Sequence, residues 1–277
     1  MAAGLRAMRG QPRVVGALLA VAGLAWWWTA RRMAGMDAGP GTSLGSVGWF
    51  AGVWVTMMAA MMLPSLAPAA AAFGASVRRG PSQVLLFAAG YLAVWSIAGL
   101  AAYGAFELGK SLFGGSLAWQ SGGRWLAAGV LLVATLYQLT RAKRTFLGRC
   151  RVEAQSFGGT AETTRRGAFS AGLRNGGWCL GCTWALMAAL FALGVMSVLW
   201  MGLIALLVAL EKIGPSGAGA RLATAGILVL FAAGILAVPQ EVPGFVVPSS
   251  SGSAPMMMKA MGSRPGMDVW WCLFSRT

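Results

Sequence analysis

The sequence predicts an all-α fold, a polytopic transmembrane helix bundle with six or seven spans. Hydrophobic residues make up 57% of the 277 positions and charged residues only 10%, and the mean hydropathy is +0.68. A soluble domain typically has about 25% charged residues. Apolar stretches of about 18 residues or more cross a bilayer as helices, because their backbone groups must hydrogen-bond within the segment. Several such stretches follow one another along this chain.

The first apolar stretch runs from Val14 to about Ala30, after three arginines, and it contains three consecutive tryptophans near its end. Tryptophan favours the membrane interface, and no small-residue cleavage pattern accompanies the stretch. We therefore expect a retained first helix rather than a signal peptide. Residues 1–46 are predicted to form this N-terminal anchor helix and its loop.

The later apolar stretches predict the other spans, at about 47–75, 83–107, 125–140, 168–193, 197–210 and 222–238. The run from 168 to 210 is too long for one ordinary span at 1.5 Å per residue. Gly194 offers a break there, and Ser197 could cap a following helix. One bent helix in its place would give six spans instead of seven. Residues 239–277 are predicted to be a disordered tail rich in Met, Ser and Pro.

The net charge of +15 and the pI of 11.4 would suggest nucleic acid as a partner if the protein were soluble. Here the lysines and arginines lie mostly between the apolar stretches, above all in the basic segment from Arg141 to Arg166. The positive-inside rule places such segments in the cytoplasm. We expect the lipid bilayer and no nucleic acid as a partner, with the N-terminus inside and, for seven spans, the C-terminus outside.

The chain contains no histidine. This excludes zinc or haem held by imidazole, a histidine general base and a Ser-His-Asp triad. We identify no catalytic residues and no site for an organic cofactor. A non-enzymatic role is favoured, although an enzymatic one stays open.

The sharpest local feature is a pair of cysteines, Cys179 and Cys182, in the span at 168–193. Three residues apart on a helix, they share one face. Cys150, in the basic segment, is expected on the same side of the membrane, so a three-sulfur site completed by Met187 is possible. Thiolates and thioethers select soft ions such as copper(I). The alternative is that the cysteines are small apolar residues packed between helices.

A second feature is a stripe of methionines in the span at 47–75, Met57, Met58, Met61 and Met62. Their spacing places them on one helix face, where Met61 and Met62 are candidate metal ligands and packing is the alternative. Glu211 and Lys212 end the span at 197–210. An ionisable group there is either functional or a side chain that reaches the interface.

Several motifs in order characterise the region from about Trp54 to Val238. They are Ala59-Ala60-Met61-Met62-Leu63-Pro64-Ser65, Gly90-Tyr91-Leu92 with Trp95, Tyr137-Gln138-Leu139-Thr140 through Lys143 to Cys150-Arg151, Cys179-Leu180-Gly181-Cys182 with Trp184-Ala185-Leu186-Met187, and Gly194-Val195-Met196 through Trp200-Met201 to Glu211-Lys212. Together they resemble a bacterial family, a domain of unknown function described as predicted metal-binding integral membrane proteins. The resemblance implies that residues 47–238 are a metal-binding-type membrane domain of the bacterial inner membrane.

Members of that family look as though they carry a Cys-x-x-His-Cys run in the basic segment and a Cys-Leu-Gly-Cys-Cys run in the following span. This chain has Phe146 and Arg149 in place of the first cysteine and the histidine, and Thr183 in place of the last cysteine. Cys150, Cys179 and Cys182 remain. The resemblance therefore implies a metal site with a reduced set of ligands.

The leading functional hypothesis is a membrane protein that binds a soft metal ion, copper(I) first, for delivery, sensing or transport. Its ligands would be Cys150, Cys179 and Cys182, and a metal-donor or metal-acceptor protein would be its partner. One alternative is a membrane thiol-disulfide oxidoreductase that uses Cys179 and Cys182. Another is a non-catalytic accessory subunit of a membrane complex. The sequence gives no oligomeric state.

Overall fold

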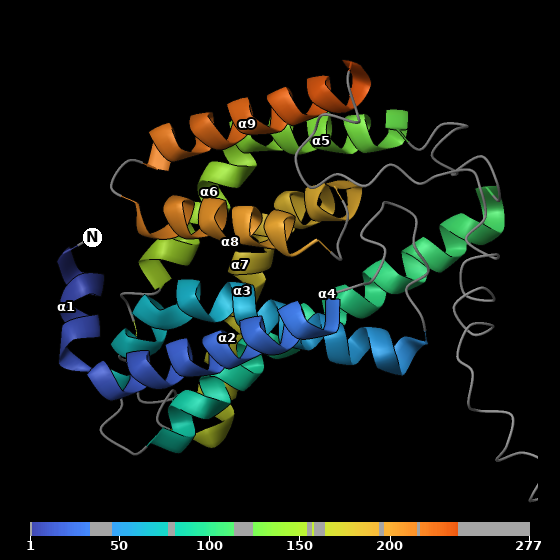
Figure 1. The fold of residues 1–277 in the computed structure, drawn as a ribbon. Helices are drawn as coiled ribbons and strands as arrows, with labels where there is room; N and C mark the ends of the chain where they lie inside the picture. The colour runs from blue at the N-terminus through green and yellow to red at the C-terminus, as the bar shows by residue number, and fades with distance from the viewer. Residues whose placement is uncertain are drawn as a thin grey trace, which may run out of the picture. The chain divides into compact units, whose positions relative to one another are not determined.

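The computed structural model describes residues 2–33, 46–76, 81–113, 124–153, 157, 164–193, 197–214 and 217–237. Within these ranges every regular element is an α-helix and no strand occurs, so the all-α class is confirmed. The helices are α1 (Ala2–Gly10), α2 (Pro12–Met33), α3 (Val47–Ser76), α4 (Pro81–Phe113), α5 (Arg124–Leu139), α6 (Arg141–Glu153), α7 (Arg165–Leu193), α8 (Val198–Ile213) and α9 (Gly217–Ala237) (Figure 1). Gly194 and the predicted tail at 239–277 lie outside the described residues.

Five of the described helices, α2, α3, α4, α7 and α9, are long and apolar enough to cross a membrane. A sixth span results if α5 and α6, which are bent by 66° at Thr140, are counted as one broken segment. The described part of the chain thus gives five or six spans rather than six or seven. The difference comes from α5 and α8, whose 16 residues each cover about 24 Å, less than a hydrocarbon core of roughly 30 Å.

The basic segment after α5, which the sequence led us to expect as a loop, contains the helix α6. Thr140 begins it, since its hydroxyl accepts a hydrogen bond from the backbone N–H of Lys143 (3.2 Å), as a helix N-cap does. Lys143, Leu147 and Cys150 are buried at helical spacing, while Arg144 and other basic side chains are exposed. The segment is therefore an amphipathic helix. Its helical spacing of buried residues was not recognised in the sequence, because basic residues surround them.

Two other helix ends differ from the sequence expectation. The N-terminal region begins with the separate helix α1, and α2 starts at Pro12, a residue favoured in the first turn of a helix. Ser197 does occupy the N-cap position of α8, but its side chain makes no capping hydrogen bond. These ends lie away from the cysteines and do not affect the geometry of the site.

Helix α7 is central to the packing, because it contacts α4, α5, α6 and α8. Its closest approach is to α4, where Gly90 of α4 lies against the backbone of Phe169 and Gly172 of α7 lies against the backbone of Phe87. A Cβ atom at either glycine would overlap a carbonyl oxygen of the other helix. Small residues allow this close backbone contact between apolar helices, and it places Tyr91 of α4 beside Cys179.

Helix α3 lies next to α2, α4 and α8, and α5 runs beside α9 (Figure 1). The indole N–H of Trp54 in α3 donates to the carbonyl oxygen of Trp95 in α4 (2.8 Å), which ties these two helices together. The cysteine region is thus enclosed by α3, α4, α6, α7 and α8. Most of the enclosing side chains are apolar, so the polar groups inside this region stand out.

Candidate metal site

The three cysteines come from two helices and are all buried with free thiols. Cys179 and Cys182 lie one turn apart on α7 and are 0% and 1% exposed, and Cys150 of α6 is 7% exposed. Cys150 and Cys179 are the side chains that act most strongly on Cys182, so the three thiols are neighbours. The sulfur of Cys182 also donates to the carbonyl oxygen of Cys179 (3.2 Å). Two helices therefore bring the three thiols into one region of the bundle.

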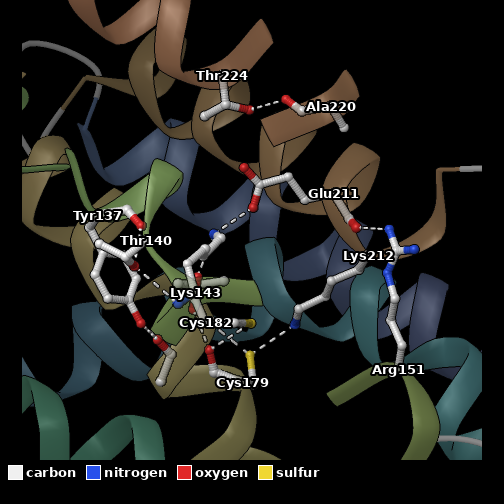
Figure 2. Close-up of polar contacts among 12 residues, drawn as sticks. Tyr137, Thr140, Lys143, Arg151, Cys179, Cys182, Glu211, Lys212, Ala220 and Thr224 are labelled. Carbon is white, nitrogen blue, oxygen red and sulfur yellow. Dashed lines mark hydrogen bonds and ion pairs between the residues drawn. The ribbon is translucent and has the colours of Figure 1, made fainter. Parts of the chain in front are cut away.

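Cys179 has the most polar partners of the three. The ammonium group of Lys212 lies 2.8 Å from its sulfur, and the hydroxyl of Tyr91 lies 2.9 Å from it. Lys212 also donates to the hydroxyl of Ser65 (3.2 Å). Figure 2 shows Lys212 extending from α8 toward Cys179. Helices α3, α4 and α8 thus each contribute a polar side chain around this one thiol.

A buried ion pair lies beside the thiols. The Lys143 ammonium is 2.6 Å from a carboxylate oxygen of Glu211, and both side chains are only 1% exposed. Lys143 also donates to the carbonyl oxygen of Cys182 (2.5 Å), as Figure 2 shows. Arg151 donates to the backbone oxygens of Glu211 and Gly214 at the end of α8. These contacts fix α6 against α7 and α8, and they hold Cys150 near Cys182.

The predicted methionines are buried on the same helices as the polar residues. Met61 and Met62 precede Ser65 on α3 by about one turn, and the Ser65 hydroxyl donates to the carbonyl oxygen of Met62 (2.9 Å). Met187 follows Cys179 on α7 by two turns, so it lies on the same side of that helix. Each of the three suits both ligation and packing, and their role as ligands stays a prediction.

The lysines and the tyrosine that surround the thiols were not predicted from the sequence. Lys212 had one signal, since it ends an apolar stretch together with Glu211. Lys143 stood in a family motif, but nothing in its basic segment distinguished it from the neighbouring lysines and arginines as a buried residue. Tyr91 lies far from the cysteines in the sequence, and only the close contact of α4 with α7 brings it to Cys179.

In the part of the chain that the structure describes, no three His, Cys, Asp or Glu side chains are arranged closely enough to hold a metal ion. The donor atoms are nevertheless soft sulfurs, which favour copper(I) and similar ions over hard cations. The adjacent ammonium group would stabilise a negatively charged thiolate or metal-thiolate group. The region thus combines soft donors with a fixed positive charge.

Comparison with known proteins places this chain in a protein family. No match was found among curated proteins or among solved structures. The model of one family, PpoB2, described as "Copper chaperone", matches residues 51–237, which include all of the polar residues above. The metal-related character expected from the sequence motifs is thereby confirmed. The match covers well over half of the chain, and the chain belongs to this copper chaperone family.

Proposed function

We propose that this chain is an integral membrane protein that binds copper(I) through Cys150, Cys179 and Cys182 and passes it to a partner protein. The observation that carries the proposal is the group of three buried free thiols, which come from two helices that pack against each other. The family description of a copper chaperone supports the same cargo. Delivery requires a donor and an acceptor, so a protein that exchanges metal with this chain is part of the proposal.

Copper(I) suits these residues better than a metal that needs four fixed ligands. Structural zinc sites are almost always four-coordinate, whereas copper(I) can be held by two or three sulfur atoms. Cys179 and Cys182 lie one turn apart on α7, which is compatible with two-sulfur ligation and rapid exchange. Met187, Met61 and Met62 are proposed as auxiliary sulfur ligands. Cys150 is the most exposed of the thiols, so an incoming ligand reaches it first.

The membrane location rests on the five helices that fit insertion. We propose the bacterial inner membrane, with the N-terminus inside, from the distribution of lysine and arginine between the apolar segments. Residues 1–46 would anchor the chain and 47–238 would hold the metal site. The exposed basic residues of α6 then face the cytoplasm, next to Cys150.

The test is metal binding by the purified full chain in detergent. We expect the wild-type protein to bind copper(I) added under reducing conditions, and the variant with Cys150, Cys179 and Cys182 all changed to Ser to lose this binding. Cys272→Ser, outside the described residues, is the matched control and should bind as the wild type does. Silver(I) should raise the unfolding temperature of the wild type and not of the triple variant, because a ligand stabilises the state that binds it. Equal copper content in the wild type and the triple variant would refute the proposal.

The thiol-disulfide oxidoreductase alternative has less support. Exchange requires that a thiolate be accessible to a second sulfur, and Cys179 and Cys182 are 0% and 1% exposed. Metal transfer also requires that a partner's ligand reach a thiol. Cys150, the most exposed of the three, provides that access. A binding role therefore accounts for all three cysteines.

A further inference from the structure

The two lysines beside the thiols differ in the partners that balance their charge. Lys143 has the carboxylate of Glu211. Lys212 donates to Cys179 and Ser65, both of which are neutral when the thiol is protonated. Among the described residues, the groups whose charge acts most strongly on Lys212 are Cys179, Tyr91, Cys150 and Cys182. Its positive charge therefore faces the sulfur of Cys179.

We propose that Lys212 determines metal specificity: its ammonium group, 2.8 Å from the sulfur of Cys179, makes the thiol site favour a monovalent soft ion over a divalent one. This inference rests on the proposed function, and it adds a residue that is not itself a ligand. Lys212 is a positioning and charge-balancing residue, since the metal would contact sulfur and the ammonium would contact the sulfur from the other side.

The physical reason is the charge of the loaded site. With the same thiolates, the copper(I) complex is more negative by one unit charge than the zinc(II) complex. A fixed positive charge next to the sulfur therefore stabilises the copper(I) complex more than the zinc(II) complex, whichever number of thiolates takes part. Charges interact more strongly in a buried site than in bulk water, and Lys212 is half-buried with its ammonium group against the fully buried Cys179.

Tyr91 and Lys212 both contact the Cys179 sulfur, so substitutions of these two residues can distinguish the effect of charge on metal binding from the effect of a hydrogen bond. Tyr91 also contacts the Cys179 sulfur, at 2.9 Å, but it does so with a neutral hydroxyl. Its removal takes away a hydrogen bond and leaves the charge of the site unchanged. Lys212→Gln removes the charge and keeps a hydrogen-bond donor, because a glutamine amide can still donate a hydrogen bond. The two residues are thus a matched pair on the same sulfur.

The experiment measures the affinities of the full-length protein in detergent for copper(I) and zinc(II), by competition with chromophoric chelators under anaerobic, reducing conditions. Lys212→Gln and Lys212→Met should lower the ratio of copper(I) affinity to zinc(II) affinity by about tenfold or more, where tenfold is 1.4 kcal/mol. Lys212→Arg, which keeps the charge, should retain most of the wild-type ratio. Tyr91→Phe should weaken both metals by similar factors and leave the ratio unchanged.

Lys110→Met is the control for loss of a lysine away from the site. Lys110 lies about 28 Å further along α4 than Tyr91, at 1.5 Å per residue. This substitution should not change the ratio of the two affinities. An unchanged ratio in folded Lys212→Gln and Lys212→Met proteins that still bind copper(I) would overturn the inference and leave the copper proposal standing. Absence of copper(I) binding in the wild type would instead overturn the proposed function, and the inference with it. If Lys212→Met does not fold, Lys212→Gln and Lys212→Arg still give the comparison.

Discussion

The regions around Lys143 and Lys212 lie on either side of Cys179 and Cys182, and each contains a lysine inside the helix bundle. Lys143 joins α6 to Glu211 of α8 through a buried ion pair and also holds the backbone of Cys182. Lys212, the next residue after Glu211, joins α8 to the sulfur of Cys179. Consecutive residues on α8 therefore connect to the same short stretch of α7, Glu211 through Lys143 and Lys212 directly.

The difference lies in when each anion exists. Glu211 is paired with Lys143 in the metal-free structure, so the Lys143 region is complete without a metal. The sulfur of Cys179 becomes fully anionic only when it loses its proton, which metal binding requires. We infer that the first region stabilises the fold, whereas the second stabilises the loaded state. The following predictions test this division, from the largest expected effect on stability to the smallest.

Lys143→Met should cause the largest loss of stability in the metal-free protein. It leaves the buried carboxylate of Glu211 without its cation, and loss of one partner of a buried ion pair typically costs about 3–5 kcal/mol. The measurement is thermal or denaturant unfolding of the purified protein in detergent. Combining Lys143→Met with Glu211→Met should recover most of the loss, because no buried charge then lacks a partner.

A double variant as unstable as Lys143→Met alone would show that packing, rather than the unpaired carboxylate, accounts for the loss. The Lys143 region would then stabilise the fold through its shape and not through its charge. Glu211→Gln gives an independent check, since it keeps the shape of the side chain and removes only its charge.

Gly172→Ala should have an intermediate effect, about 1–3 kcal/mol of destabilisation. The added Cβ would overlap the carbonyl oxygen of Phe87, so α4 must move away from α7. This shift acts on the Lys212 region, because Tyr91 of α4 would separate from Cys179, and it leaves the contact of α6 with α8 in place. We expect Cys179 to react faster with a maleimide reagent in this variant. Gly177→Ala on the same helix, where a Cβ meets nothing within 4 Å, is the control.

Lys212→Met should have the smallest effect on the metal-free protein, about 1 kcal/mol or less in unfolding free energy. It removes hydrogen bonds to a thiol and to a hydroxyl, each of which contributes modestly, and it leaves no carboxylate without a partner. Unfolding should be compared with and without added silver(I). A loss as large as that of Lys143→Met without metal would remove the distinction between the two lysines.

The helices were largely predictable from the sequence, because the backbone groups of a long apolar stretch in a membrane must hydrogen-bond within the stretch, as they do in a helix. The stretches at 47–75, 83–107 and 168–193 match α3, α4 and α7 closely. Helix α6 was missed since its buried positions include Lys143, so its apolar period is interrupted by a charge. The count of six or seven spans is not confirmed, because α5 and α8 are apolar but have only 16 residues each, and length decides whether a helix crosses the membrane.

The site was only partly predictable. The cysteines were identified by residue type alone, and the position of Cys150 near α7 depends on the 66° bend between α5 and α6. Lys212 and Tyr91 could not be assigned from the sequence, since their partner depends on which helix faces which. Pairwise contacts between distant helices come from tertiary packing, and local periodicity carries no information about them.

The reciprocal glycine contact between α4 and α7 has a consequence for handling the protein. Lipid tails are as apolar as leucine side chains, so association of helices inside a bilayer depends on close van der Waals contact rather than on expulsion of water. Gly90 and Gly172 provide such contact between the two backbones. The position of Tyr91 over the Cys179 sulfur is therefore set by protein atoms alone, and it should survive transfer of the chain from lipid into a mild micelle.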